Sequence, residues 1–234
     1  AYTEIKDNPD GSHTADLYFE PVKFKTNEGK YEYIDLSLEK TGEAFKTAAS
    51  PVESVFSSNA SDSAVRLAKG DVEIAFRPTP KEEIQSKSQR IDLKTSVVTA
   101  KDNDADTIKY ENILNDGQDI SLTPTANGVK EDIILSALPK ETYFSFDFNL
   151  KGVYPLLLED GNVWFLNENT NEITAAVPAP VMYDSSDEQR ESYEIEVDII
   201  KIDEGEYRYV ITPDRQWLSS EDRVYPVYID PSVS

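Results

Sequence analysis

The 234-residue chain contains no cysteine, one histidine and one methionine. The absence of cysteine excludes a disulfide scaffold and any zinc or iron–sulfur site with cysteine ligands. The single histidine, His13, cannot supply the clustered imidazoles that zinc and iron sites need. A chain of this length can bury a hydrophobic core without covalent staples. The sequence therefore predicts a fold held by packing and hydrogen bonds, and it indicates no cofactor.

The chain also has no run approaching the roughly 18 apolar residues that cross a membrane. We therefore expect no membrane insertion. Residues 1–12 (AYTEIKDNPDGS) lack the basic head and apolar run of a signal peptide. If the protein is exported, we expect its signal peptide upstream of this sequence.

Basic residues are scarce: 23 Lys and Arg stand against 45 Asp and Glu, for a net charge of −22. The excess is concentrated after residue 100, since residues 1–100 carry −4 and residues 101–234 carry −18. Such a field repels phosphate backbones and anionic lipids, so we expect no nucleic-acid partner. High acidity also keeps an exposed protein soluble. Cations, basic proteins and neutral glycans remain possible ligands.

Alternation of apolar and polar residues is the dominant local pattern. It predicts strands with one buried and one solvated face, whereas helical spacing would scatter the same apolar groups. The clearest runs are Phe144–Leu150, Tyr193–Ile199, Val72–Phe76 and Tyr225–Ile229. In the last run, Pro226 cannot donate to a central ladder, which predicts an edge or terminal strand.

Glycine-containing turn signals separate these runs, because glycine accepts the positive φ that tight hairpins require. Asp160-Gly161 and Glu204-Gly205 are the best hairpin candidates. Similar pairs are Asp10-Gly11, Glu28-Gly29, Asp116-Gly117 and Asn127-Gly128. Many short strands with regular turns indicate an all-β, antiparallel β-sandwich-like module.

Very little helix is expected. Residues 81–90 (KEEIQSKSQR) fit either a short polar helix or a loop, and residues 213–218 (PDRQWL) fit one helical turn with proline at an early position. We expect residues 1–234 to form a single all-β module. Two lobes divided near residues 100–106, where the sequence is polar and the charge shifts, are the alternative.

The sequence carries no recognisable catalytic motif. His13 lies in a turn beside Ser12, there is no G-x-S-x-G elbow, and neighbouring strand residues point to opposite faces. Gly128 lacks the second glycine and the Ser or Thr of a phosphate-binding loop. Glycoside hydrolysis needs a pair of carboxylates, but among 45 acidic residues such pairs occur by chance, so the sequence singles out no pair. We therefore expect that the chain is not an enzyme.

Calcium is the one metal that the sequence leaves open, because it takes oxygen ligands. Asp102, Asp104 and Asp106 repeat at every second position, as at the start of a calcium loop. Thr107 stands where such a loop has glycine, and Ile113 stands where it has the closing acid. Solvated charge is the simpler interpretation, and a bound Ca²⁺ is the alternative.

Three aromatic residues are the candidates for carbohydrate binding: Trp164, Tyr183 and Trp217. Aromatic faces stack on sugar rings while acids and amides bind the hydroxyls. The competing interpretation is core packing, since large aromatic side chains are usually well buried. Because Trp164 and Phe165 are neighbours in an expected strand, one of them must face away from the core.

Several stretches in order along the chain form a recognisable set: residues 7–25, 29–40, 106–110, 127–135, 177–180, 182–184, 216–218 and 224–233. Together they resemble the N-terminal region of DNRLRE-domain and Rhs (YD-repeat) wall-associated secreted proteins of Gram-positive bacteria. The similarity implies an extracellular or cell-surface location within a much larger chain, and it carries over no functional residue.

The sequence thus predicts a non-catalytic extracellular structural or spacer module of a large secreted or cell-wall-associated bacterial protein. A carbohydrate-binding module that contacts cell-wall or plant polysaccharide is the alternative, and an acid-pair glycoside hydrolase comes last. The expected partners are neighbouring domains of the same parent chain and, in the alternative, a cell-wall or environmental glycan.

Overall fold

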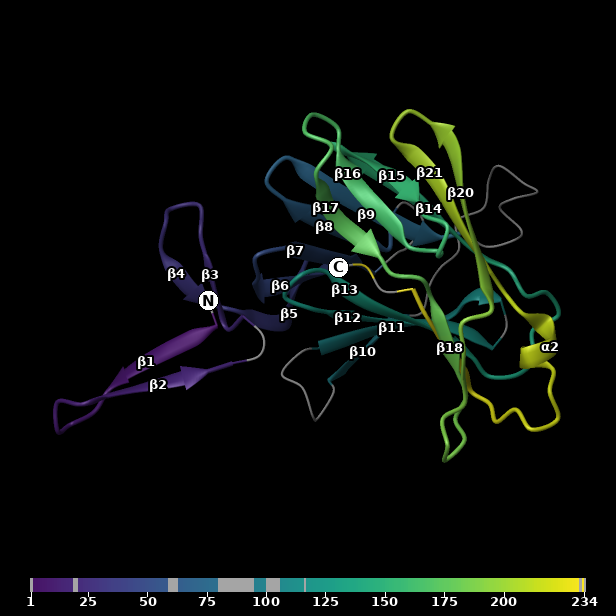
Figure 1. The fold of residues 1–234 in the computed structure, drawn as a ribbon, viewed down its shortest axis with the longest axis horizontal. Coiled ribbons are helices and arrows are strands. Elements are labelled where there is room, and N and C mark those ends of the chain that lie inside the picture. The colour runs from purple at the N-terminus through teal and green to yellow at the C-terminus, as the bar shows by residue number, and fades with distance from the viewer. Residues whose placement is uncertain are drawn as a thin grey trace.

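The computed structural model describes residues 2–18, 21–58, 63–79, 95–99, 106–115, 117–231 and 233. In this part of the chain nearly all regular structure is β-strand, and every strand pairing is antiparallel. The prediction of an all-β, sandwich-like fold with very little helix is confirmed. Figure 1 shows the strands gathered into layers, with two hairpins standing apart on the left.

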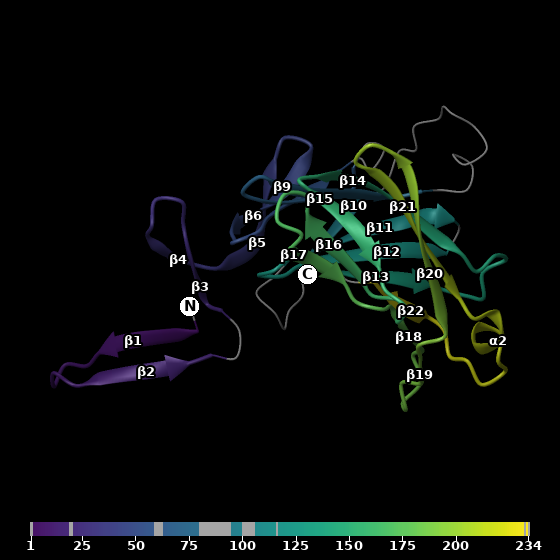
Figure 2. The same ribbon diagram turned by 45° about the horizontal axis from the view of Figure 1, so that its top comes forward.

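The largest sheet has eight strands and forms one layer of the sandwich (Figures 1 and 2). Its middle strands carry apolar side chains on the inner face and charged side chains on the outer face. In spatial order the strands are β20 (Ile195–Asp203), β21 (Glu206–Pro213), β14 (Phe144–Lys151), β9 (Val72–Pro78), β8 (Val65–Lys69), β7 (Glu53–Ser57), β6 (Ala44–Ala49) and β5 (Asp35–Thr41).

A seven-stranded sheet forms the second layer. Its strands are β10 (Thr95–Thr99), β11 (Asp106–Asn115), β12 (Gln118–Pro124), β13 (Val129–Leu135), β22 (Val227–Asp230), β18 (Val181–Tyr183) and β19 (Glu191–Ser192), in that order. The last strand in the sequence, β22, thus lies between β13 and β18, and it pairs with β13, which precedes it by more than 90 residues.

Smaller sheets complete the described fold. A three-stranded sheet of β15 (Val153–Leu157), β16 (Val163–Asn167) and β17 (Ile173–Val177) covers one end of the sandwich. Near the N-terminus, two hairpins project from the body (Figure 1). They pair β1 (Thr3–Asp7) with β2 (His13–Leu17), and β3 (Lys23–Lys25) with β4 (Tyr31–Tyr33).

The core lies between the layers and is rich in aromatic rings. Phe148 packs against Phe76, Phe165 and Tyr209 with ring centroids 5.3, 5.7 and 6.1 Å apart. Phe165 comes from the three-stranded sheet, so this cluster joins that sheet to the eight-stranded one. Full burial of each large apolar side chain contributes roughly 1.5–3 kcal/mol. The alternating sequence therefore produces the layers by burying one face of each sheet.

Tyr110 connects the two large sheets directly. Its ring is completely buried, and its hydroxyl donates to the carbonyl oxygens of Ser57 at 2.7 Å and Ala64 at 3.1 Å. The tyrosine belongs to β11 of the seven-stranded sheet, whereas the two carbonyls belong to the region of β7 and β8. A buried polar group is thereby satisfied across the interface between the layers.

The predicted hairpins are confirmed at both of the best candidates. Asp160-Gly161 connects β15 to β16, and Glu204-Gly205 connects β20 to β21. At Gly205 the φ angle is +72°, and a Cβ atom would lie 2.8 Å from the carbonyl oxygen of Leu150. The carbonyl oxygen of Gly205 also accepts a hydrogen bond from the Leu150 amide at 2.8 Å. Glycine is therefore required here, because the φ angle is positive and because a Cβ atom would be too close to the Leu150 carbonyl.

Two predictions about strands are corrected. The run at Tyr225–Ile229 was predicted to be an edge or terminal strand; it gives β22, which begins at Val227 and is the last strand in the sequence, but β22 lies inside the seven-stranded sheet and is not an edge. Pro226 precedes the strand, so its missing N–H removes no ladder bond. Tyr193 does not share the buried face of β20 either. It precedes that strand and its side chain is 71% exposed.

The predicted helical turn within residues 213–218 is present as α2 (Arg215–Leu218), but Pro213 ends β21 instead of standing early in the helix. Asp214 caps it, since its carboxylate accepts from the amides of Gln216 and Trp217. The expectations for residues 81–90 and for a division near residues 100–106 fall outside the described residues, apart from Asp106. In the described segments no helix is long and apolar enough to span a membrane.

A carboxyl group is buried inside this core. Glu131 on β13 points between the layers and is 3% exposed. Burial raises its pKa well above the usual 4.5, and the charges of Asp132 and Asp230 raise it further. Burial and the Glu131 carboxyl also raise the pKa of Tyr209, which is 2% exposed. The folded protein therefore keeps the Glu131 carboxyl protonated over a pH range in which an exposed glutamate is ionised.

This burial predicts a pH-dependent stability. Above pH 4.5 the unfolded chain releases the Glu131 proton while the folded chain retains it, so stability falls as pH rises towards the folded pKa. We expect Glu131→Gln to raise the melting temperature at pH 8 by a few degrees, since about 1 kcal/mol corresponds to roughly 2–4 °C for a chain of this size. The gain should vanish near pH 4 in thermal scans.

The control for this measurement is Glu159→Gln, which changes an exposed carboxylate. It should leave the melting temperature unchanged at both pH values. Equal melting curves for the wild type and Glu131→Gln at pH 8 would contradict a buried, protonated Glu131.

Candidate functional site

The most elaborate polar arrangement in the described residues is centred on Asp184, directly after β18. Its carboxylate is completely buried. It accepts from the backbone amides of Ser186 at 3.2 Å, Arg190 at 3.0 Å and Val224 at 3.3 Å, and from the Ser186 hydroxyl at 2.6 Å. The Arg223 guanidinium donates to its second oxygen at 2.9 Å. One side chain thereby joins residues 184–190 to residues 223–224.

Electrostatics at Asp184 favour the charged form. Burial by itself raises the pKa of a carboxyl group, but the hydrogen bonds from Ser186, Val224 and Arg190 outweigh it. The pKa of Asp184 is therefore held well below its usual value of 3.8. All its acceptor positions are occupied by protein donors, so the group acts as a structural anchor for the surrounding loops.

Trp217, a candidate for carbohydrate binding, belongs to the same neighbourhood. The Arg223 guanidinium carbon lies 3.3 Å from the centroid of its ring, and the Arg223 Nε donates to the Trp217 carbonyl at 3.1 Å. The indole is half-buried and packs against the core. One face of the ring is thus covered by a cation, which stabilises the C-terminal segment through a cation–π contact.

Tyr183 lies on the outer face of the seven-stranded sheet. Its ring stacks on Tyr228 with centroids 5.2 Å apart and an interplanar angle of 11°. The Tyr183 hydroxyl donates to Asp132 at 3.2 Å, and Lys130 contacts the same carboxylate at 2.8 Å. Burial and the Asp132 charge raise the pKa of Tyr183. Tyr183 and Tyr228 are both half-buried.

Trp164 lies elsewhere, on β16 of the three-stranded sheet. It is half-buried, while its neighbour Phe165 is 1% exposed and belongs to the core. This confirms that one of the two residues faces away from the core. The printed contacts thus link Trp217 to Asp184 through Arg223, whereas Tyr183 contacts Tyr228 and Asp132, and Trp164 lies on a different sheet.

The predicted metal ligands are mostly outside the described residues. Asp102 and Asp104 fall there, and Asp106 is the first residue of β11. Among the described residues, no group of three or more His, Cys, Asp and Glu side chains is placed to hold a metal ion. A calcium site at these three aspartates stays a prediction.

His13 opens β2 on the projecting N-terminal hairpin. Its side chain is 68% exposed, and its Nδ1 lies 2.7 Å from a carboxylate oxygen of Asp7, which is 86% exposed. Both side chains of this pair are therefore exposed to solvent.

Sequence reasoning missed an ion-pair network on the outer face of the eight-stranded sheet. Glu53 on β7 contacts both Lys46 on β6 and Arg66 on β8, and Arg66 also contacts Glu73 on β9 at 3.1 Å. The alternation of each strand placed these residues on the solvated face. Their pairing depends on strand order and register, which the sequence does not reveal.

The fold and this chemistry define a class: an antiparallel β-sandwich protein with an acidic surface. No family model matches the chain, and no solved structure matches it.

Curated proteins similar to the chain are named tRNA nucleases. They are the tRNA(Glu)-specific nuclease WapA of Bacillus subtilis subsp. natto and the tRNA nuclease WapA of Bacillus subtilis strain 168, each 27% identical over 99% of this chain. The tRNA3(Ser)-specific nuclease WapA of Bacillus spizizenii is 26% identical over the same share. The chain spans about a tenth of the length of these relatives.

These matches overturn two predictions. The chain was expected to be no enzyme, and to be a non-catalytic structural or carbohydrate-binding module, whereas its relatives are named as nucleases. The reason for the error is physical. One histidine, no cysteine and a charge of −22 describe this segment, and they carry no information about the other nine-tenths of such a protein.

The Asp184 arrangement predicts a large loss of stability on substitution. Asp184→Asn removes the charge that offsets the buried Arg223 guanidinium, which is 5% exposed. Breaking a buried pair in this way costs about 3–5 kcal/mol. Urea denaturation at pH 7 should show a loss of this size.

The pH dependence provides a second check. Because the folded pKa is lowered, the contribution of Asp184 is present above pH 3.8 and is lost as pH falls through the folded pKa. The difference between wild type and variant should therefore shrink in acid. Asp187→Asn, in the same loop but exposed, is the control and should behave as wild type. A wild-type midpoint for Asp184→Asn would refute this role.

Proposed function

We propose that the chain is a segment of a tRNA nuclease of the WapA kind, and that the protein as a whole cleaves tRNA. The observation that carries the proposal is the length of the similarity, which runs over 99% of the chain in each of three proteins named as tRNA nucleases. A match over the whole segment supports common ancestry of the segment better than a short shared motif would.

The charge of the segment refines this proposal. A protein that binds tRNA needs Lys and Arg side chains to neutralise phosphates. Residues 117–231 carry 8 basic and 23 acidic side chains, so this part of the chain repels RNA. We propose that the basic surface that holds tRNA lies in other segments of the protein, and that the direct partners of this chain are neighbouring domains.

We also propose an extracellular or cell-surface location. It is supported by the resemblance of the stretches quoted above to wall-associated secreted proteins, which itself stays a prediction. The abundance of acidic side chains is compatible with a protein that stays soluble outside the cell.

The experiment uses the full-length protein that contains this segment. We expect the purified protein to convert end-labelled tRNA into discrete fragments on a denaturing gel. Residues 1–234 assayed alone in parallel will assign the cleavage to this segment or to the remainder. Because the segment is strongly acidic, we expect it to give no band shift with tRNA at 150 mM salt.

Two results would count against these statements. Intact tRNA after incubation with the full-length protein would overturn the nuclease assignment. A salt-sensitive shift of tRNA by residues 1–234 alone would overturn the proposal that tRNA is held elsewhere. A preparation from cells lacking the gene controls for contaminating ribonucleases.

A further inference from the structure

The projecting β1–β2 hairpin exposes its apolar face and covers its polar one. Thr3 pairs with Leu17, and Ile5 pairs with Ala15. Because side chains of a strand alternate between its two faces, these four residues lie on one face. Ile5 is 69% exposed and Leu17 is 80% exposed, whereas Glu4 on the other face is half-buried. This is the reverse of the usual arrangement, in which apolar side chains are covered and carboxylates are in solvent.

The second hairpin, β3–β4, covers the polar face. Glu4 accepts hydrogen bonds from the hydroxyl of Tyr33 on β4 and from that of Tyr18 at 3.3 Å, and it lies 3.8 Å from the Nζ of Lys23 on β3. The Lys23 ammonium in turn lies 4.1 Å from the centroid of the Tyr33 ring. These contacts hold the two hairpins together on the side of Glu4. The exposed side chains of Ile5 and Leu17 are therefore on the side away from the second hairpin.

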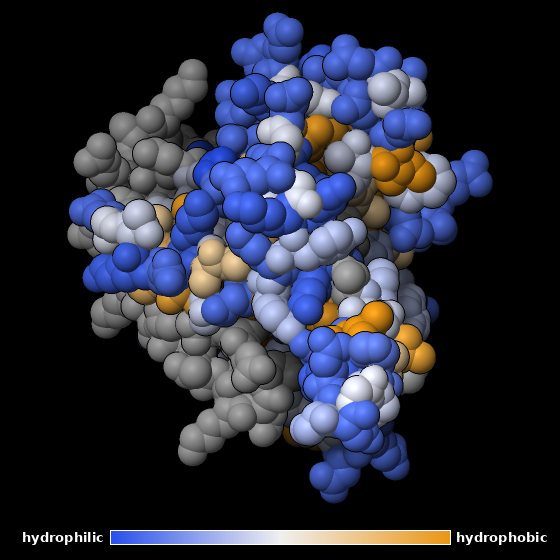
Figure 3. Space-filling model, turned by 90° about the vertical axis from the view of Figure 1, so that its left-hand side faces the viewer, coloured by the Kyte–Doolittle hydropathy of each residue, from blue (hydrophilic) through white to orange (hydrophobic). Residues whose placement is uncertain are grey.

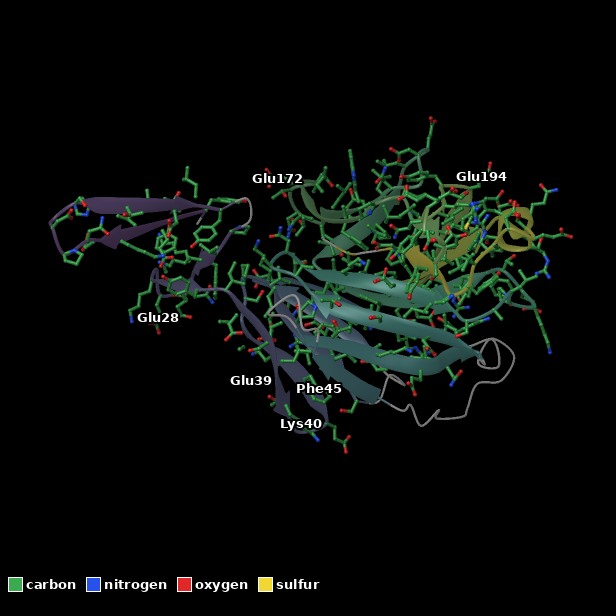
Figure 4. All side chains as sticks on the ribbon, turned by 90° about the horizontal axis from the view of Figure 1, so that it is seen from below. Glu28, Glu39, Lys40, Phe45, Glu172 and Glu194 are labelled. Carbon is green, nitrogen blue, oxygen red and sulfur yellow. The ribbon has the colours of Figure 1, made fainter. Side chains whose placement is uncertain are left out.

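The hairpin is also separate from both large sheets. Among the described residues β1 and β2 pair only with each other, so both of its outer edges have unpaired backbone groups. It projects from the body in Figures 1 and 4, where Glu28 marks the tip of the β3–β4 hairpin. Figure 3 views the side from which the hairpins project and shows separate hydrophobic patches among hydrophilic side chains. Since an isolated two-stranded hairpin is marginally stable in water, a surface that covered the apolar face would stabilise it.

The size of the apolar face limits which partner can hold it. The face presents four side chains, whereas a stable interface between separate proteins uses roughly 20–30 residues on each side. A partner in the same chain needs a smaller contact, because linkage gives it an effective concentration on the order of millimolar. The small face therefore favours a neighbouring domain of a longer chain over an unlinked second copy.

The charge of the hairpin indicates the chemistry of that partner. Residues 2–18 carry one basic and four acidic side chains. Asp7 lies on the apolar face toward the tip, and among the described residues it contacts the His13 ring but no Lys or Arg. A second copy of the hairpin, or the acidic surface of residues 117–231, would repel these charges. A surface with a basic side chain beside an apolar centre would attract them.

We propose that the β1–β2 hairpin docks through Ile5 and Leu17 on a neighbouring domain of the longer protein. The docking surface is an apolar patch beside a Lys or Arg side chain that contacts Asp7. This inference rests on the proposal that the chain is a segment of a longer protein of the WapA kind. It identifies the surface through which the segment contacts the rest of that protein.

Hydrogen–deuterium exchange of the full-length protein and of residues 1–234, read by mass spectrometry, tests the docking. We expect the amides of residues 3–17 to exchange at least tenfold more slowly in the full-length protein. Leu17→Lys should restore fast exchange there, because burying an unpaired charge in an apolar contact is unfavourable. The same variant should leave the melting temperature of residues 1–234 unchanged, since Leu17 is exposed in the segment.

Two further variants separate the apolar contact from the charge. Asp7→Lys should speed the exchange of residues 3–17 in the full-length protein at least threefold, because it reverses the charge that faces the basic side chain. The matched control is Ile200→Lys, which makes a similar change at an aliphatic position on β20 that is also exposed. Ile200→Lys should leave the hairpin as slow to exchange as in the wild type.

Several outcomes would overturn the docking. They are equal exchange of residues 3–17 in the two proteins, slow exchange that Leu17→Lys retains, and no effect of Asp7→Lys. Dimers of residues 1–234 in sedimentation velocity that Leu17→Lys abolishes would show that a second copy is the occupant. Cleavage of tRNA by a protein with an unprotected hairpin would contradict this inference alone, whereas intact tRNA with a protected hairpin would contradict the nuclease assignment alone.

Discussion

The contact between the inner faces of the two large sheets is the constraint on which the rest of the structure depends. The same core extends to the three-stranded sheet through Phe148, which touches rings from its own sheet and from that smaller sheet. Because these faces are committed to the core, most acidic side chains of the alternating strands lie outside, and the buried exceptions in the described strands are Glu131 and Asp119. The alternation of apolar and polar residues along the strands thus accounts for both the acidic surface and the apolar core.

Closing the sandwich depends on residues far apart in the sequence. Tyr110 reaches across to Ser57 and Ala64, and β22 fills the gap between β13 and β18. The Asp184 carboxylate then fixes the loops that deliver β22 to that position, through Val224 and Arg223. A buried charge at such a place contributes to the arrangement of the chain more than to surface chemistry.

Local features of the fold were predictable, and long-range ones were not. The alternation in Phe144–Leu150 gave a strand, and Glu204-Gly205 gave a hairpin, since both depend on neighbours in sequence. The position of β22 inside a sheet could not be read from Tyr225-Pro226, because strand order is decided by packing. For the same reason Asp184 looked like any other loop aspartate, although its position before Ser186 is typical of a side chain that accepts from nearby amides.

The distribution of charge along the chain bears on how this segment can lie relative to a tRNA substrate. The acidic surface belongs mainly to residues 117–231, whereas the described residues between 21 and 79 are balanced. A tRNA nuclease that contains this segment must keep the acidic part away from its substrate, because like charges in contact cost affinity. The division of charge along the chain thus separates a segment that repels nucleic acid from one in which basic and acidic side chains balance.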